Sequence, residues 1–210
     1  ASIADMQAGL GSVAMLLGET SGGGLATLMK LDLDNLDQET VEGQLMTHAS
    51  GLRFLSAALQ PEIAQGHLPV AHVDAVLTRL AKTADYLYLD LGSVLDEATS
   101  HAITRCDVVI VVVEPERVCL TLAKALLDRI HVLDPQPDEL CVVMTERVEA
   151  GAAYGPREVE SMLGLELAGV IEPAGEAARQ AVEQGMPIVL MQPESPVAEQ
   201  ILDLNHRLLI

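Results

Sequence analysis

The sequence has 210 residues, half of them apolar, with one Phe, three Tyr and no Trp, so its core must be built from aliphatic side chains. Its 31 acidic and 12 basic residues give a formal net charge of −19, which argues against binding to nucleic acid or anionic lipid, because both need a basic surface. No apolar run predicts a membrane-spanning helix, no signal peptide is visible, and the three cysteines form no C-x-x-C pair, so we expect a cytoplasmic protein without a cysteine metal site or membrane insertion.

The chain opens at residues 1–5, which we interpret as the end of a strand. The segment Gly9-Leu-Gly11-Ser-Val-Ala14 then matches the G-x-G-x-x-A dinucleotide fingerprint. This match is weak evidence, because the fingerprint needs a buried strand before it and Asp5 and Gln7 interrupt the few residues available. Three consecutive glycines at 22–24 predict a surface turn.

Apolar runs farther along the chain predict the strands. The run at 107–113 has β-branched residues at every position after Asp107, which is typical of a strand buried on both faces of a parallel sheet. The run Tyr86–Leu89 is too apolar for an edge strand, so we expect it at the centre of the sheet. The predicted strands are 86–90, 107–113, 140–144 and 167–171, with shorter candidates at 52–56 and 188–191.

Helical patterns separate these runs, with apolar residues at spacings of three and four. Gly164 and Gly185 lie where helix C-termini are expected. The predicted helices are 70–84, 95–105, 116–133, 156–163, 175–184 and 196–209. Alternating strands and helices predict a doubly wound α/β fold, with a mostly parallel sheet, helices on both faces and a single domain over residues 1–210.

Asp90 ends the run at 86–90 with a carboxylate. In nucleotide hydrolases a carboxylate at this place orders the water shell of Mg²⁺, but a strand can also simply reach solvent at an Asp. A phosphate-binding loop would read G-x-x-x-x-G-K-[ST]. Of the three lysines only Lys82 is followed by Thr, and Ala81 stands where that motif needs Gly, so the motif is absent from these residues.

The motifs taken together resemble the MinD/ParA superfamily of deviant-Walker ATPases. The segments that carry the resemblance are Asp5-Met-Gln-Ala-Gly9, Ser50–Leu55, Tyr86–Asp90, Cys106–Pro115 and the tail from Pro173 to Gly185-Met-Pro187. They are most similar to the CpaE/TadZ branch, which helps to place pilus and secretion machinery. The family's first strand and P-loop are missing, so the resemblance implies that the 210 residues belong to a longer parent chain.

The resemblance also assigns roles to single residues. Asp5 matches the second acid of the family's D-x-D, which positions the attacking water, although Ile3 stands where the first acid belongs. Asp90 matches the Walker B carboxylate, which is the catalytic and metal-binding acid. The family's base-reading Asn-Arg and its base-covering loop fall on Thr145, Glu146, Arg147 and Pro173, which are the candidate cofactor-binding residues.

Two functions follow from this resemblance. The first is an ATPase domain of CpaE/TadZ type that positions or assembles pilus or secretion machinery through nucleotide-dependent homodimerisation. ATP and Mg²⁺ would be its cofactors if a P-loop lies upstream, and none is expected for this chain alone. The alternative is a catalytically inactive scaffold that binds protein partners of such an assembly without turnover. Ile3 and the Thr145-Glu146 pair favour this alternative.

Overall fold

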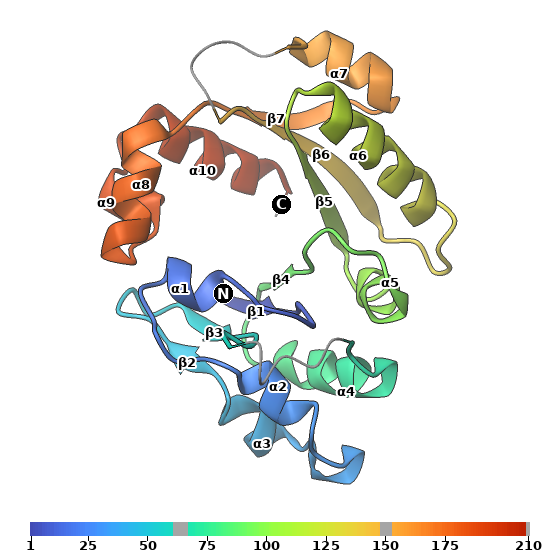
Figure 1. The fold of residues 1–210 in the computed structure, drawn as a ribbon, viewed down its shortest axis with the longest axis vertical. Coiled ribbons are helices and arrows are strands. Elements are labelled where there is room, and N and C mark those ends of the chain that lie inside the picture. Colours follow the sequence, from blue (N-terminus) through green and yellow to red (C-terminus); the bar gives the residue numbers. More distant parts are fainter. Residues whose placement is uncertain (61–66, 148–152, 209–210) are drawn as a thin grey trace. The chain divides into compact units, whose positions relative to one another are not determined.

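The computed structural model describes residues 1–60, 67–147 and 153–208, and the chain divides into two compact units. Unit 1 comprises residues 1–102 and 182–186, and unit 2 comprises residues 103–181 and 187–210. Both contain parallel strands joined by helices (Figure 1), which confirms the predicted doubly wound α/β class. The assignment of residues 1–210 to a single domain stays a prediction.

Unit 1 contains a four-stranded sheet of order β2-β3-β1-β4. Strand β1 runs parallel to both of its neighbours, while β2 forms a short antiparallel pair with β3. The elements are β1 (Ser2–Asp5), α1 (Val13–Leu16), α2 (Gly24–Leu28), the 3-10 helix η1 (Leu33–Asn35), α3 (Gln38–Glu42), β2 (Met46–Thr47), β3 (Arg53–Leu55), α4 (Val70–Leu80), β4 (Leu87–Asp90) and α5 (Glu97–Ile103).

Alternating side chains of this sheet enter two apolar clusters. Ala4 and Leu55 pack with residues of α2, α3 and α4, whereas Ile3 and Phe54 pack with α1. Helix α4 buries Val73, Val76, Leu77 and Leu80, the apolar face that its sequence predicts. The two clusters pack against the two faces of the sheet. This packing holds the sheet in place and so determines where the ends of its strands lie.

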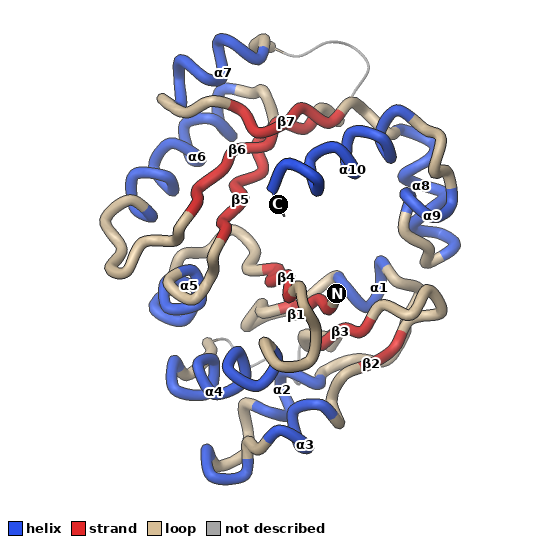
Figure 2. Tube along the Cα trace, turned by 180° about the vertical axis from the view of Figure 1, so that it is seen from behind, coloured by secondary structure: helices blue, strands red, loops and turns tan. Residues whose placement is uncertain are grey.

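Unit 2 contains a three-stranded parallel sheet of order β5-β6-β7. Helices α6 and α7 cover one face and α10 the other (Figures 1 and 2). On α10, Leu204 lies so close to Gly169 of β7 that a Cβ there would stand 3.3 Å from it. The elements are β5 (Val108–Val113), α6 (Arg117–Ile130), β6 (Glu139–Thr145), α7 (Pro156–Leu163), β7 (Leu167–Ile171), α8 (Gly175–Gln184), α9 (Ile188–Met191) and α10 (Pro196–Leu208). The last three residues of α8 belong to unit 1.

Most predicted elements are confirmed, with bounds that differ by a few residues from those predicted. Helices α7 and α8 begin and end at the predicted residues. Gly164 and Gly185 have φ of 76° and 61°, the left-handed backbone expected just after a helix. No helix in the described part of the chain is long and apolar enough to cross a bilayer.

Two strand predictions are wrong about position or burial. Among the described strands of unit 1, β4 pairs with β1 alone and lies at the end of the strand order, where Tyr86 and Tyr88 are 46% and 40% exposed. Strand β5 is buried on one face only, because Ile110 and Val112 are 40% and 61% exposed while the residues between them are buried. The apolar composition of both runs therefore does not mean two buried faces in the described structure.

Two shorter predictions are also wrong. Residues 188–191 form helix α9 rather than a strand, because Pro187 stands at the N-cap and begins a helical turn. The glycine segment is not only a surface turn: Gly23 is buried and its amide donates to Ser56 Oγ at 3.0 Å.

Candidate functional site

Two carboxylates end neighbouring parallel strands of unit 1. Asp5 is the last residue of β1, Asp90 is the last residue of β4, and the two are register partners. Because the carboxyl ends of parallel strands meet at one edge of a sheet, this register places both acids together. Asp5 is 1% exposed, whereas Asp90 is only partly buried. The structure thus brings together the two residues predicted to be catalytic, and their roles stay a prediction.

The backbone after β1 holds the Asp5 carboxylate. Val13 N–H donates to Asp5 Oδ2 at 3.2 Å, and Gln7 N–H donates to Asp5 Oδ1 at 3.4 Å. Burial raises the pKa of Asp5 from its ordinary 3.8, the hydrogen bond from Val13 partly opposes this, and the charge of Asp90 raises the pKa further. Asp5 is therefore a fixed carboxyl group that holds a proton more tightly than a solvent-exposed Asp.

Gly11 is what lets this loop pass so close to Asp5. A Cβ on Gly11 would stand 2.0 Å from Asp5 Oδ2 and 2.5 Å from the Cβ of Ala57. The G-x-G-x-x-A match therefore has a structural explanation, because its second glycine packs against a buried carboxylate. The helix that follows, α1, has only four residues, which makes it a poor anchor for a pyrophosphate.

Asp90 receives one hydrogen bond on each oxygen. Gly92 N–H donates to Oδ1 at 3.2 Å, and Gln7 Nε2 donates to Oδ2 at 3.3 Å. Gly92 has φ of 66°, a left-handed conformation that glycine adopts without strain. Sequence reasoning missed Gln7 and Gly92 as members of this site. The available signal was their position, since each stands two residues after one of the acids.

The pair of acids suits a hydrated divalent cation. Mg²⁺ prefers oxygen ligands, keeps several waters, and is commonly held by one or two carboxylates together with substrate phosphates. Asp90 keeps free lone pairs beside its two neutral donors, so it is the better candidate ligand. Within the described ranges no group of three or more His, Cys, Asp or Glu could hold a metal by itself. Such a site would therefore depend on phosphate oxygens.

The four candidate base-contacting residues lie in unit 2, at the carboxyl ends of two adjacent strands. Thr145 ends β6 and pairs in register with Ile171, the last residue of β7. Glu146 N–H donates to the Ile171 carbonyl at 3.0 Å, and Pro173 follows β7 two residues later. The parallel register thus brings the two predicted segments to one sheet edge.

Arg147 does not extend from this edge as a free side chain. Its Nε lies 2.7 Å from Glu114 Oε1, just after the end of β5, so the pair links two loops at the strand ends of unit 2. Arg147 is 77% exposed in its side chain, so this ion pair contributes little to stability. The guanidinium therefore remains accessible, although it is already paired.

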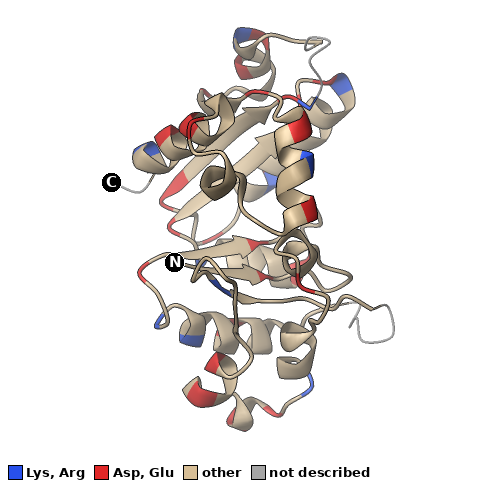
Figure 3. Cartoon of the chain, turned by 90° about the vertical axis from the view of Figure 1, so that its left-hand side faces the viewer, with Lys and Arg blue, Asp and Glu red and all other residues tan. Residues whose placement is uncertain are grey.

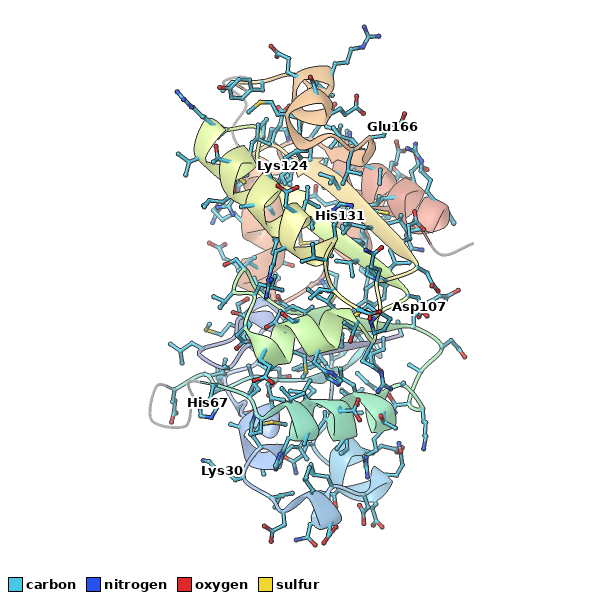
Figure 4. All side chains as sticks on the ribbon, turned by 90° about the vertical axis from the view of Figure 1, so that its right-hand side faces the viewer. Lys30, His67, Asp107, Lys124, His131 and Glu166 are labelled. Atoms are coloured by element: carbon cyan, nitrogen blue, oxygen red, sulfur yellow. The ribbon has the colours of Figure 1, made fainter. Side chains whose placement is uncertain are left out.

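Acidic residues outnumber basic residues in both units (Figure 3). Two of the three lysines, Lys30 and Lys124, lie at the surface in Figure 4. Lys124 on α6 pairs with Asp128 at 2.9 Å, one turn farther along the helix. Lys30 is exposed and follows α2. No lysine accompanies a phosphate-binding motif in the 210 residues, as the sequence indicates.

No protein-family model matches the chain. Over 138 residues it is 26% identical to an uncharacterised ATP-binding protein of Methanocaldococcus jannaschii, a match that covers 65% of this chain and 51% of that protein. The chain thus matches about half the length of this curated relative.

Solved structures resemble the chain over nearly its whole length. A ParA family ATPase from Chlorobium tepidum has a TM-score of 0.84 at 18% identity, covering 99% of this chain and 84% of the other. The septum site-determining protein MinD of Pyrococcus horikoshii, solved with Mg-ADP, has a TM-score of 0.79 at 18% identity, covering 97% and 80%. At these identities the likeness concerns the fold, and the chain has the α/β fold of the MinD and ParA ATPases.

Proposed function

We propose that the chain is part of a MinD/ParA-superfamily ATPase of CpaE/TadZ type. The observation that carries the proposal is the in-register pair of Asp5 and Asp90 at the carboxyl ends of β1 and β4. A relative described as ATP-binding and a fold neighbour solved with Mg-ADP support it. The pilus or secretion role, the homodimer and its protein partners rest on the resemblance of the sequence motifs.

In this proposal the two acids have different tasks. Bound magnesium would neutralise charge on the nucleotide phosphates. Asp90, held on both oxygens by neutral donors, would hold water molecules of the cation. Asp5, fixed by Val13 and Gln7, would accept a hydrogen bond from the attacking water. A raised pKa suits such a role, because a general base works best when its pKa approaches the working pH.

The residues that grip phosphates are not among these 210, because no G-x-x-x-x-G-K-[ST] motif occurs in them. The hydrolase proposal therefore concerns the full-length protein. Thr145, Glu146 and Pro173 would lie near the base, with Arg147 beside them.

A second candidate, a scaffold that binds protein partners without turnover, is favoured by specific departures from the family pattern. Ile3 packs into the apolar cluster with α1, so no carboxylate stands at the first position of the D-x-D. Glu146 can only accept hydrogen bonds when ionised, whereas the Asn expected there both donates and accepts. These departures weaken catalysis and adenine recognition without weakening the fold.

Replacement of Asp90 separates the two candidates. In the full-length protein, Asp90→Ala should abolish Mg²⁺-dependent ATP hydrolysis and leave the thermal unfolding midpoint nearly unchanged, because Asp90 is only partly buried. Asp85→Ala is the matched control, since Asp85 is an exposed acid that precedes the opposite end of β4. Wild-type turnover that survives in Asp90→Ala would refute the role proposed for Asp90. A wild type without turnover but with intact partner binding would support the scaffold.

A further inference from the structure

Gln7 contacts both acids of the pair, although the proposed chemistry gives its side chain no task. Its backbone N–H donates to Asp5 Oδ1 at 3.4 Å, and its side-chain Nε2 donates to Asp90 Oδ2 at 3.3 Å. The side chain thus connects the loop after β1 to the end of β4. A neutral donor between two carboxylates also reduces their mutual repulsion, since each acid gains a hydrogen bond without gaining a neighbouring charge.

Gly92 contacts both Gln7 and Asp90. A Cβ on Gly92 would stand 3.3 Å from both Cδ and Oε1 of Gln7, so the carboxamide lies against the bare backbone of the β4 turn. The same Gly92 donates its N–H to Asp90 Oδ1. Asp90 is therefore held on one oxygen by the turn and on the other by Gln7, and its orientation depends on both.

We propose that Gln7 is a positioning residue that orients the Asp90 carboxylate for a hydrated divalent cation. This inference rests on the proposed function of the same site. The length and the neutrality of glutamine both matter: a methionine of similar size has no donor, and a glutamate would set a third negative charge against Asp90. Partners that orient a ligating carboxylate typically change metal affinity by about 10- to 100-fold when removed.

The first test uses Mn²⁺ as the probe, with binding to the full-length protein in complex with a non-hydrolysable ATP analogue followed by water proton relaxation, because the cation site depends on phosphate oxygens. Gln7→Met should weaken Mn²⁺ binding by about tenfold and leave the thermal unfolding midpoint close to that of the wild type. Gln180→Met is the matched control, because Gln180 also donates its amide to a carboxylate, that of Glu176, but on helix α8. Equal Mn²⁺ affinity in Gln7→Met and the wild type would overturn the proposal.

The second test separates the positioning role from the proposed function. In metal-free protein the ¹³C carboxyl resonance of Asp90 should shift in Gln7→Met and stay in place in Gln180→Met. If the wild type does not bind Mn²⁺ at all, the cation site fails, and this resonance alone decides whether Gln7 positions Asp90. An unchanged Asp90 resonance would overturn the inference in either case.

Turnover gives a third readout in the full-length protein. Gln7→Met should lower kcat while KM for ATP stays within about twofold of the wild type, because Gln7 contacts the two acids rather than a nucleotide-binding segment. Should Gln7→Met unfold, Gln7→Asn keeps the polarity but is too short to reach Asp90. It should then show the same loss of Mn²⁺ affinity, and wild-type affinity in Gln7→Asn would refute the role.

Discussion

Gly11→Ala tests whether the close packing of the loop after β1 holds the Asp5 carboxylate in place. The new methyl group would stand 2.0 Å from Asp5 Oδ2 and 2.5 Å from the Cβ of Ala57, so at least one of these groups must move. The backbone of Gly11 cannot easily retreat, because its N–H donates to the Ala58 carbonyl at 3.0 Å. We therefore expect Asp5 to move and to lose its hydrogen bond from Val13.

The size of the effect follows from these two losses. Overpacking of a buried site costs about 1–3 kcal/mol, and loss of a hydrogen bond to a charged group costs about 1.5–3 kcal/mol. The sum is about 2.5–6 kcal/mol. For a chain of this length, 1 kcal/mol lowers the unfolding midpoint by roughly 2–4 °C, so Gly11→Ala should lower it by about 10 °C.

Gly9→Ala is the internal control, because a Cβ on Gly9 meets no atom within 4 Å. Its unfolding midpoint should equal that of the wild type or rise slightly, since alanine restricts the unfolded chain. Differential scanning calorimetry of the wild type, Gly11→Ala and Gly9→Ala measures the three unfolding midpoints. A Gly11→Ala midpoint within about 2 °C of Gly9→Ala would refute this account of Gly11 and return the two glycines to the dinucleotide interpretation.

Three further predictions concern charge and binding. Burial raises the folded-state pKa of Asp5, so the stability that Asp5 contributes is present below its unfolded pKa of 3.8 and is lost as pH rises through the folded-state pKa. The thermal unfolding midpoint of Asp5→Asn should therefore fall less than that of the wild type between about pH 4 and 7. Parallel plots of midpoint against pH for the two proteins would contradict this. Calorimetry should find no micromolar ATP binding to the 210 residues, because they lack the phosphate-gripping motif; measurable micromolar affinity would show that other groups suffice. Co-sedimentation should find no pelleting with anionic vesicles at physiological salt, because α10 carries Arg207 as its only Lys or Arg and packs on β7; substantial pelleting would refute this.

The sequence was sufficient to predict most of the helices and strands from residue 52 onward, but not α2, η1, α3 and β2. An apolar run that stops at a carboxylate marks where a parallel strand leaves the core, which is why Asp5 and Asp90 could be named before their register was known. The neighbours of a strand are harder to predict, because apolar composition does not specify them. Strand β4 was therefore expected at the centre of the sheet and lies at its edge.

Short apolar segments and side-chain contacts were also beyond pattern reasoning. Residues 188–191 fit a strand or a helix equally well by composition, and only Pro187 and the local backbone favour the helix. Gln7 reaches Asp90 across 83 residues of sequence, and this contact depends on a bare backbone at Gly92. No spacing rule within one segment encodes such a contact.

The two groups of candidate residues bear differently on the two functions. In unit 1 the acids are in register, each is held by neutral donors, and two glycines make room for them, so this part keeps the pair of carboxylates that the hydrolase proposal needs. In unit 2, the resemblance places Thr145 or Glu146 where the family has a side chain that both donates and accepts, and Arg147 is paired with Glu114. Adenine recognition affects which nucleotide binds, whereas the acids affect whether a bound nucleotide is hydrolysed. The hydrolase proposal therefore depends on Asp5, Gln7 and Asp90, and the departures in unit 2 bear on nucleotide selectivity rather than on turnover.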